Sequence, residues 1–188
     1  MLTLPNILTL GLLVLVPCFL WASMRGMYTA AFAIFVSAAV TDVLDGAIAR
    51  RFNLRSRLGA ILDPAADKTL IVCGFVYYTF AGGLPRVGIP PWLTFTVFIR
   101  DVMIVFFAYL MYTRIRITRF PPTVWGKIST LLQAVTLAAA IAVNGPLPGL
   151  HGFAQLLFRL SLFMTLFSGW DYLRRASKIV RAELPVQA

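Results

Sequence analysis

The chain is 188 residues long, with 60% hydrophobic and only 13% charged residues, and its mean hydropathy is +0.84. Globular proteins carry about 25% charged residues, so this composition excludes a soluble domain built around one core and predicts an integral membrane protein. The net charge of +10 is concentrated beside apolar stretches and is not interleaved with base-stacking aromatic residues, which excludes nucleic acid and favours membrane lipids with anionic headgroups as partners.

Six apolar stretches follow one another along the chain, most of them near the roughly 20 residues that cross a bilayer. Glycine and proline separate them, as at Gly82-Gly83 and Pro121-Pro122. The stretches predict helices over residues 7–21, 28–50, 67–81, 92–112, 128–143 and 153–173. We therefore expect an all-α integral membrane fold, a six-transmembrane-helix bundle that forms a single domain over residues 1–188.

The first apolar stretch has no basic leading segment and no small-residue cleavage site after it. We interpret it as a retained span rather than a signal peptide. Cys18 and Cys73 lie in apolar stretches and form no C-x2-C pattern, so they predict neither a disulfide framework nor a thiolate metal site.

Basic residues follow the second, fourth and sixth stretches, whereas the opposite connections carry few. Cytoplasmic loops of membrane proteins are enriched in Lys and Arg. Both termini and the connection after the second helix are therefore expected on the cytoplasmic side. We expect the membrane itself to be the inner membrane of a bacterium. The cations that define this pattern are Arg50, Arg51, Arg55, Arg57, Arg114, Arg116, Arg119, Lys127, Arg174, Arg175, Lys178 and Arg181.

Four of the seven acidic residues lie in one window that apolar sequence borders on both sides. Asp42 and Asp45, and likewise Asp63 and Asp67, have the spacing that places two side chains on one helix face, one turn apart. Carboxylates are costly in a membrane and mark functional sites there. Oxygen ligands without His or Cys favour Mg2+ or Mn2+. Two such ions can clamp a diphosphate while it is cleaved.

Two glycines and an arginine accompany these carboxylates. Gly46 and Gly59 leave room for a bulky ligand or for a neighbouring backbone, and tight helix packing in a membrane explains each glycine equally well. Arg50 lies one turn beyond Gly46, where its guanidinium can meet phosphate oxygens.

Together these residues form the pattern Asp42-x2-Asp45-Gly46-x2-Ala49-Arg50-x8-Gly59-x3-Asp63-x3-Asp67. The pattern resembles, without a gap or a substitution, the signature of the CDP-alcohol phosphatidyltransferase family. Shorter stretches extend the resemblance over most of the chain: Pro5-Asn6-x2-Thr9, Leu62-Asp63-Pro64-x-Ala66-Asp67-Lys68, Arg100-Asp101, Gly126-Lys127-x-Ser129-Thr130-x2-Gln133 and Ser168-Gly169-Trp170-Asp171-Tyr172.

The resemblance implies a homodimer of six-helix chains with the active site at the cytoplasmic side. It implies transfer of a phosphatidyl group from CDP-diacylglycerol to an alcohol, with release of CMP. Asp42, Asp45 and Asp63 would hold two Mg2+ or Mn2+ ions, and Asp67 would complete the metal site and act as general base. The residues implied in CDP-diacylglycerol binding are Asp42, Gly46, Ala49, Arg50 and Gly59.

The acceptor alcohol divides the part of the family that this chain resembles most. Phosphatidylglycerophosphate synthases take glycerol 3-phosphate and typically carry cations where this chain has Ala108 and Ser129. Because a hydrogen bond to a charged group contributes about 1.5–3 kcal/mol, the absent cations favour phosphatidylglycerol, the acceptor of cardiolipin synthases. The alternative is glycerol 3-phosphate, since residues 168–172 resemble that branch and other cations can replace the missing ones. The candidates for binding the acceptor phosphate are Arg100, Arg114, Arg116, Arg119 and Lys127.

Two features depart from this interpretation. Leu12 stands where the family usually has an arginine, which removes one expected phosphate contact. Arg100 and Asp101 are equally explained as an ion pair that stabilises the bundle. An ion-coupled transporter is the rival from another functional class, but it predicts inverted repeats and broken helices, and the sequence shows neither.

Overall fold

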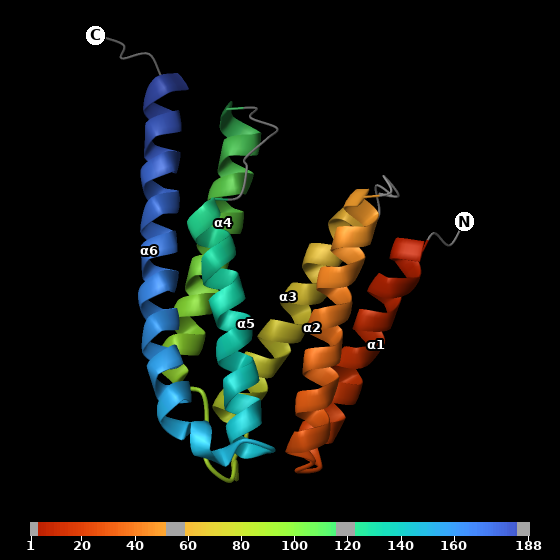
Figure 1. Cartoon of the computed structure of the whole chain (residues 1–188). Coiled ribbons are helices and arrows are strands. Elements are labelled where there is room, and N and C mark those ends of the chain that lie inside the picture. The colour runs from red at the N-terminus through yellow and green to blue at the C-terminus, as the bar shows by residue number, and fades with distance from the viewer. Residues whose placement is uncertain (1–3, 52–58, 116–122, 184–188) are drawn as a thin grey trace. The chain divides into compact units, whose positions relative to one another are not determined.

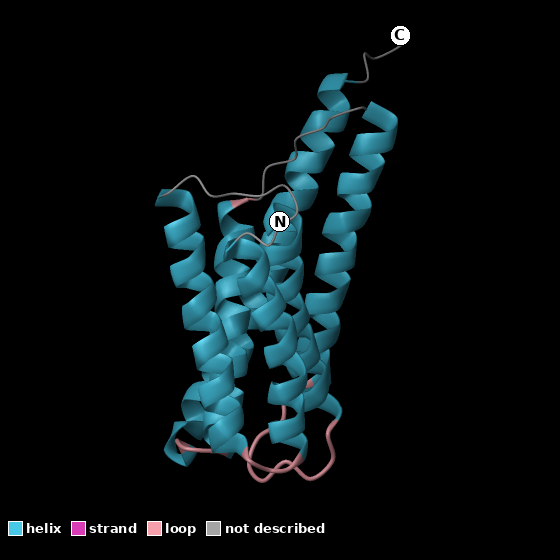
Figure 2. Ribbon diagram, turned by 90° about the vertical axis from the view of Figure 1, so that its right-hand side faces the viewer, coloured by secondary structure: helices cyan, strands magenta, loops and turns pink. Residues whose placement is uncertain are grey.

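A computed structural model describes the backbone of residues 4–51, 59–115 and 123–183, and the side chains of residues 14–41, 68–110, 113 and 123–177. The described chain is helical, without a strand in these ranges (Figures 1 and 2). The helices are α1 (Leu4–Met24), α2 (Tyr28–Arg51), α3 (Gly59–Phe80), α4 (Pro91–Ile115), α5 (Val124–Asn144) and α6 (His151–Glu183), with a 3-10 turn, η1 (Pro148–Leu150), before α6. Each of the six predicted stretches therefore forms a helix.

The helices are longer than the apolar stretches that predicted them. α3 begins at Gly59 instead of residue 67, and α6 continues past residue 173 to Glu183. The prediction followed hydrophobicity, whereas a helix ends where its backbone hydrogen bonds end, and those bonds continue through polar sequence. As a consequence, the whole carboxylate pattern apart from the connection 52–58 has a helical backbone.

Three of the described helical segments are long and apolar enough to cross a membrane: Pro91–Leu110, Val124–Asn144 and Pro148–Ser177. Shorter apolar helical segments cover Val14–Met24, Tyr28–Thr41 and Lys68–Phe80. Large apolar side chains along α4, such as Ile99, Val102 and Val105, are about two-thirds exposed. Such exposure fits contact with lipid, where apolar side chains need no protein cover.

The chain divides into two compact units. Unit 1 comprises Met1–Ile89 and Leu137–Ala154, and unit 2 comprises Pro90–Thr136 and Gln155–Ala188. In unit 1, α1 packs against both α2 and α3. The core there is aromatic, because the ring of the buried Phe19 lies 6.0 Å from that of Phe35 and 6.4 Å from that of Tyr78, centroid to centroid.

A buried asparagine joins the end of α5 to the loop before α4 within unit 1. The Asn144 side-chain oxygen accepts hydrogen bonds from the backbone N–H groups of Arg86 (3.0 Å) and Val87 (3.2 Å). Its amide group donates to the carbonyls of Val87 (2.6 Å) and Ala140 (2.9 Å). One side chain thus satisfies four backbone groups where a helix end would otherwise leave some unpaired.

Candidate active site

The helical backbone carries the carboxylate pattern at the end of one helix and the start of the next. Asp42 and Asp45 lie near the end of α2, whereas Asp63 and Asp67 lie near the start of α3. Figure 1 shows these two helix ends at the same end of unit 1. The helical spacing that the carboxylate hypothesis requires is therefore present, although all four side chains lie outside those described.

The remaining donor-site candidates have the same backbone setting. Gly46, Ala49 and Arg50 lie on α2 after Asp45, and Gly59 is the first residue of α3. Their side-chain positions also fall outside the described set. Among the side chains that the structure does describe, no group of three or more His, Cys, Asp or Glu residues forms a metal site. Four carboxylates without a nitrogen or sulfur ligand make a donor set that suits Mg2+ or Mn2+.

The structure describes only some of the basic residues near the helix connections that are candidates for binding the acceptor phosphate. Arg114 lies in the last turn of α4 with its side chain outside the described set, and Arg116 and Arg119 lie wholly outside the described residues. Lys127 lies in the first turn of α5, where its side chain is exposed.

Arg100 is buried inside unit 2, with only 7% of its surface exposed. Its Nη1 lies 2.9 Å from Asp101 Oδ1 and forms an ion pair with it. Nη2 donates to Ser168 Oγ on α6 at 2.7 Å and to the Gly126 carbonyl on α5 at 3.4 Å. Nε is buried and has no hydrogen-bond partner among the described residues. The neighbouring ion pair that the sequence allowed is thus formed, and three of the five N–H groups of the guanidinium have partners within the protein.

Two glycines let α5 and α6 approach α4 closely near Arg100. A Cβ placed on Gly126 would lie 3.1 Å from Arg100 Nη2 and 3.2 Å from Thr123 Oγ1. A Cβ on Gly169 would lie 3.3 Å from Met103 Cε. All three separations are tight for a methyl group, so a side chain at either position displaces its neighbour.

A row of polar side chains extends from Arg100 along the contact between α5 and α6. Gln133 Nε2 donates to Ser129 Oγ (3.3 Å) and to Thr165 Oγ1 (3.1 Å), and the Ser129 and Thr165 hydroxyls lie 3.3 Å apart. We call the buried residues Ser129, Gln133, Thr136, Ser161, Thr165 and Ser168 the polar seam. Ser129 occupies a position where phosphatidylglycerophosphate synthases typically carry a cation. Its hydroxyl forms hydrogen bonds with neighbours inside the protein.

Sequence reasoning did not identify three members of the seam: Thr136, Ser161 and Thr165. The hydroxyls of Thr136 and Ser161 lie 2.7 Å apart. The signal was available, since polar residues recur at spacings of three and four along both apolar stretches and so share one helix face.

Comparison with known proteins identifies the same family that the carboxylate pattern resembles. The sequence profile of the CDP-alcohol phosphatidyltransferase family matches residues 2–167. A probable phosphatidylglycerophosphate synthase of Mycobacterium tuberculosis is 34% identical, with 92% of this chain and 81% of the relative aligned. The human cardiolipin synthase (CMP-forming) is 32% identical, with 95% of this chain and 63% of the relative aligned.

A third relative has nearly the same length as this chain. The CDP-diacylglycerol–glycerol-3-phosphate 3-phosphatidyltransferase of Aquifex aeolicus is 29% identical, and the alignment covers 95% of this chain and 98% of the relative. Because the profile covers most of the chain and includes the whole carboxylate pattern, the chain belongs to the CDP-alcohol phosphatidyltransferase family of enzymes.

Proposed function

We propose that this enzyme transfers a phosphatidyl group from CDP-diacylglycerol to phosphatidylglycerol, which yields cardiolipin and CMP. Membership of the family and the names of the relatives support the donor. In this reaction the acceptor hydroxyl oxygen attacks the phosphorus of the phosphatidyl group. A new P–O bond forms, the P–O bond to CMP breaks, and the hydroxyl proton passes to a base.

The carboxylates at the ends of α2 and α3 take the chemical roles in this proposal. Asp42, Asp45, Asp63 and Asp67 hold two Mg2+ or Mn2+ ions, which supply charge neutralisation at the diphosphate when bound. Asp67 accepts the hydroxyl proton, since a positioned general base contributes roughly a hundredfold or more even when its basicity is modest. The donor is bound by Asp42, Gly46, Ala49, Arg50 and Gly59, with the Arg50 guanidinium at the diphosphate.

The hydrogen-bond partners of Arg100 support phosphatidylglycerol as the acceptor. Three of its five N–H groups already bind Asp101, Ser168 and the Gly126 carbonyl, and its charge is paired with that of Asp101, so few donors are left for a ligand. Few remaining donors on a cation that is already paired suit the single charge of a phosphodiester better than the two charges of a phosphomonoester, which need more donors for compensation. Ser129 adds no charge, since its side chain is neutral, and its hydroxyl is hydrogen-bonded within the polar seam.

Glycerol 3-phosphate is the second candidate acceptor. The Aquifex aeolicus relative, which aligns over nearly its whole length, is named for that substrate. In this case Arg114, Arg116, Arg119 and the exposed Lys127 would supply the phosphate site.

We also propose how the chain lies in the membrane. All six helices span it as one domain, both termini and the carboxylate pattern face the cytoplasm, and the chain acts as a homodimer in the inner membrane of a bacterium. The bias of basic residues toward the last turns of α2, α4 and α6 and toward the connections after α2 and α4 supports this orientation.

The acceptor is tested with the purified full-length protein, CDP-diacylglycerol and Mg2+. Phosphatidylglycerol and glycerol 3-phosphate are supplied separately and then together, and the lipid products are resolved by mass. We expect cardiolipin to dominate and product formation to stop after chelation. Preferential formation of phosphatidylglycerophosphate would reject phosphatidylglycerol as the acceptor, and turnover after complete chelation would reject the metal site.

The roles of the carboxylates are separated in the same assay. Asp67→Asn should lose transfer while it retains binding of the metal and CDP-diacylglycerol, whereas Asp45→Asn should weaken binding itself. Calorimetric titration with Mn2+ and donor measures the binding. If Asp67→Asn binds neither ligand, Asp67 is a metal ligand without a role as base.

A further inference from the structure

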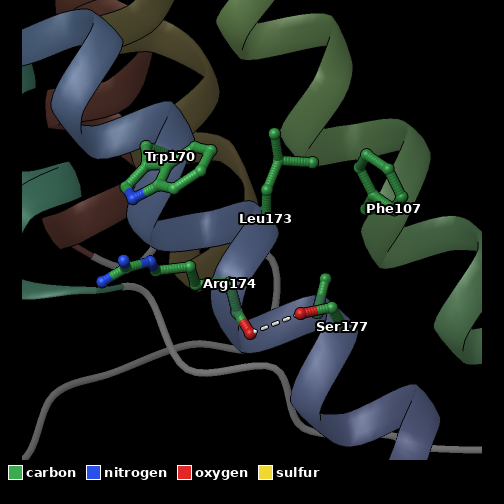
Figure 3. Close-up of a pocket in the computed structure, with 6 residues that line it drawn as sticks. Phe107, Trp170, Leu173, Arg174 and Ser177 are labelled. Carbon is green, nitrogen blue, oxygen red and sulfur yellow. Dashed lines mark hydrogen bonds between the residues drawn. The ribbon is translucent and has the colours of Figure 1, made fainter.

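A groove of about 410 Å³ lies on the surface of unit 2 between α4 and α6 (Figure 3). Its volume is within the range of about 300–1,000 Å³ that is usual for ligand sites. None of its lining residues belongs to the carboxylate pattern or contributes to the polar seam. They are Phe107, Trp170, Leu173, Arg174, Ala176 and Ser177.

The walls of the groove are apolar. Figure 3 shows Leu173 projecting from α6 toward Phe107 on α4, with Trp170 one turn before it. The Trp170 side chain is 56% exposed and Leu173 is 37% exposed, whereas Ala176 is buried. Exposed apolar walls of this kind fit a hydrocarbon chain, because they offer contact area and few polar groups.

A cation stands at the edge of these walls. The Arg174 guanidinium carbon lies 5.1 Å from the centroid of the Trp170 ring, and Figure 3 shows both side chains extending on the same side of α6. The nearest acidic side chain on the helix, Asp171, lies 3.2 Å from Arg175 Nε. Among the described side chains, no carboxylate forms an ion pair with Arg174, which is exposed. This cation is thus available to an anion at the membrane surface.

The position of the pair on the chain sets its depth in a bilayer. Trp170 and Arg174 lie toward the end of the candidate span Pro148–Ser177, where tryptophan and arginine typically occupy the headgroup level. Phe163 and Leu166, seven and four residues before Trp170, carry exposed apolar side chains on the same face of α6. A ligand with a charged head and an apolar tail matches this order of surfaces.

We propose that the groove binds an anionic glycerophospholipid of the surrounding bilayer, with an acyl chain along Phe107 and Leu173 and the phosphate at Arg174. A second copy of the chain is the weaker occupant, because a symmetric contact over the groove brings two Arg174 side chains together. The phosphate forms charge-assisted hydrogen bonds with the guanidinium. Trp170 remains stacked on the same cation.

Fluorescence quenching tests this site in the full-length protein. Trp21, Trp92 and Trp125 are changed to Phe, which leaves Trp170 as the reporter. The protein is placed in phosphatidylcholine vesicles that contain a minor fraction of lipid with brominated acyl chains, either phosphatidylglycerol or phosphatidylcholine. We expect brominated phosphatidylglycerol to be enriched about fivefold at Trp170, the ratio that corresponds to about 1 kcal/mol per basic residue near the surface. Arg174→Gln should make the two lipids quench equally.

The control is a second pair of an arginine and a tryptophan, with Trp21 as the fluorescent reporter. Arg25 lies 5.5 Å from the ring of Trp21 and forms a similar exposed pair. With Trp21 as the sole tryptophan, Arg25→Gln should change the lipid preference much less than Arg174→Gln does at Trp170. An equal change at both sites shows general surface attraction and overturns the groove site. Equal quenching by the two lipids with Arg174 intact, or quenching that falls as protein density rises, also overturns it, the latter in favour of a second copy.

Discussion

Unit 1 and unit 2 differ in the contacts that stabilise each of them internally. In unit 1, rings of the fully buried Phe19 and Tyr78 pack with Phe35 between α1, α2 and α3. In unit 2, hydroxyl, amide and guanidinium groups join α4, α5 and α6, and the cation of Arg100 lies at one end of the polar seam. Aromatic packing depends on shape, whereas a hydrogen-bonded row also depends on the direction of each group.

The difference indicates how each unit fixes its candidate residues. The aromatic core of unit 1 sets the spacing of the helices whose ends carry the carboxylates. The polar contacts of unit 2 orient a single guanidinium, since three of its hydrogen bonds have fixed partners. Substitutions that keep volume but remove polarity should therefore affect unit 2 more than unit 1.

The largest effect is expected at Arg100. Arg100→Leu removes the cation that pairs with Asp101, whose side chain is only 13% exposed. Breaking a buried ion pair from one side costs about 3–5 kcal/mol of folding free energy. Thermal unfolding of the purified protein in detergent measures the loss. The double variant Arg100→Leu with Asp101→Leu should recover most of it, and a double variant as unstable as the single one would show that the charge left behind is not the cause.

A smaller effect is expected at Asn144, which makes a buried polar contact in unit 1. Asn144→Ala leaves the buried N–H group of Val87 without its acceptor, and an unsatisfied buried group costs about 1–3 kcal/mol. Asn144→Asp keeps an oxygen for the N–H groups of Arg86 and Val87 but loses the donor to the Val87 carbonyl. The unfolding temperature should fall in the order wild type, Ala, Asp, because the Asp carboxylate is a buried charge that faces two carbonyl oxygens. Equal values for all three would mean that the loop is held by other contacts.

The smallest effect is expected inside the polar seam. Gln133→Leu and Thr165→Val each remove their mutual hydrogen bond of 3.1 Å. Hydrogen bonds between membrane helices contribute about 0.6 kcal/mol on average. A double-mutant cycle on unfolding free energy should yield a coupling of that size.

Tyr78→Phe in unit 1 is the comparison for this cycle. It keeps the ring and removes only a hydroxyl that lies 3.4 Å from Ser23 Oγ. It should change stability less than either seam variant does. A larger loss at Tyr78 than in the seam would contradict the contrast between the two units.

Local sequence was a good guide to the helices and a poorer guide to their ends. The sequence predicts Tyr28 as the first residue of α2, and α2 begins there. The glycine just before it, Gly26, adopts a φ of 71°, which favours glycine in a turn. The start of α3 at Gly59 was missed, since residues 59–66 are less apolar than the stretch that follows them. Hydrophobicity predicts which part of a helix lies in the membrane. The backbone hydrogen bonds of the helix continue beyond that part, so hydrophobicity does not predict where the helix ends.

The sequence by itself determined the class, the family and the carboxylate pattern. These depend on composition and on spacing along one chain, which a helix converts directly into a shared face. Only the tertiary structure decided that Arg100 meets Ser168 and Gly126 from two other helices, and that Ser129 is held by Gln133 and Thr165. Contacts between residues far apart in sequence depend on how helices pack, and a single sequence does not encode that packing in any local pattern.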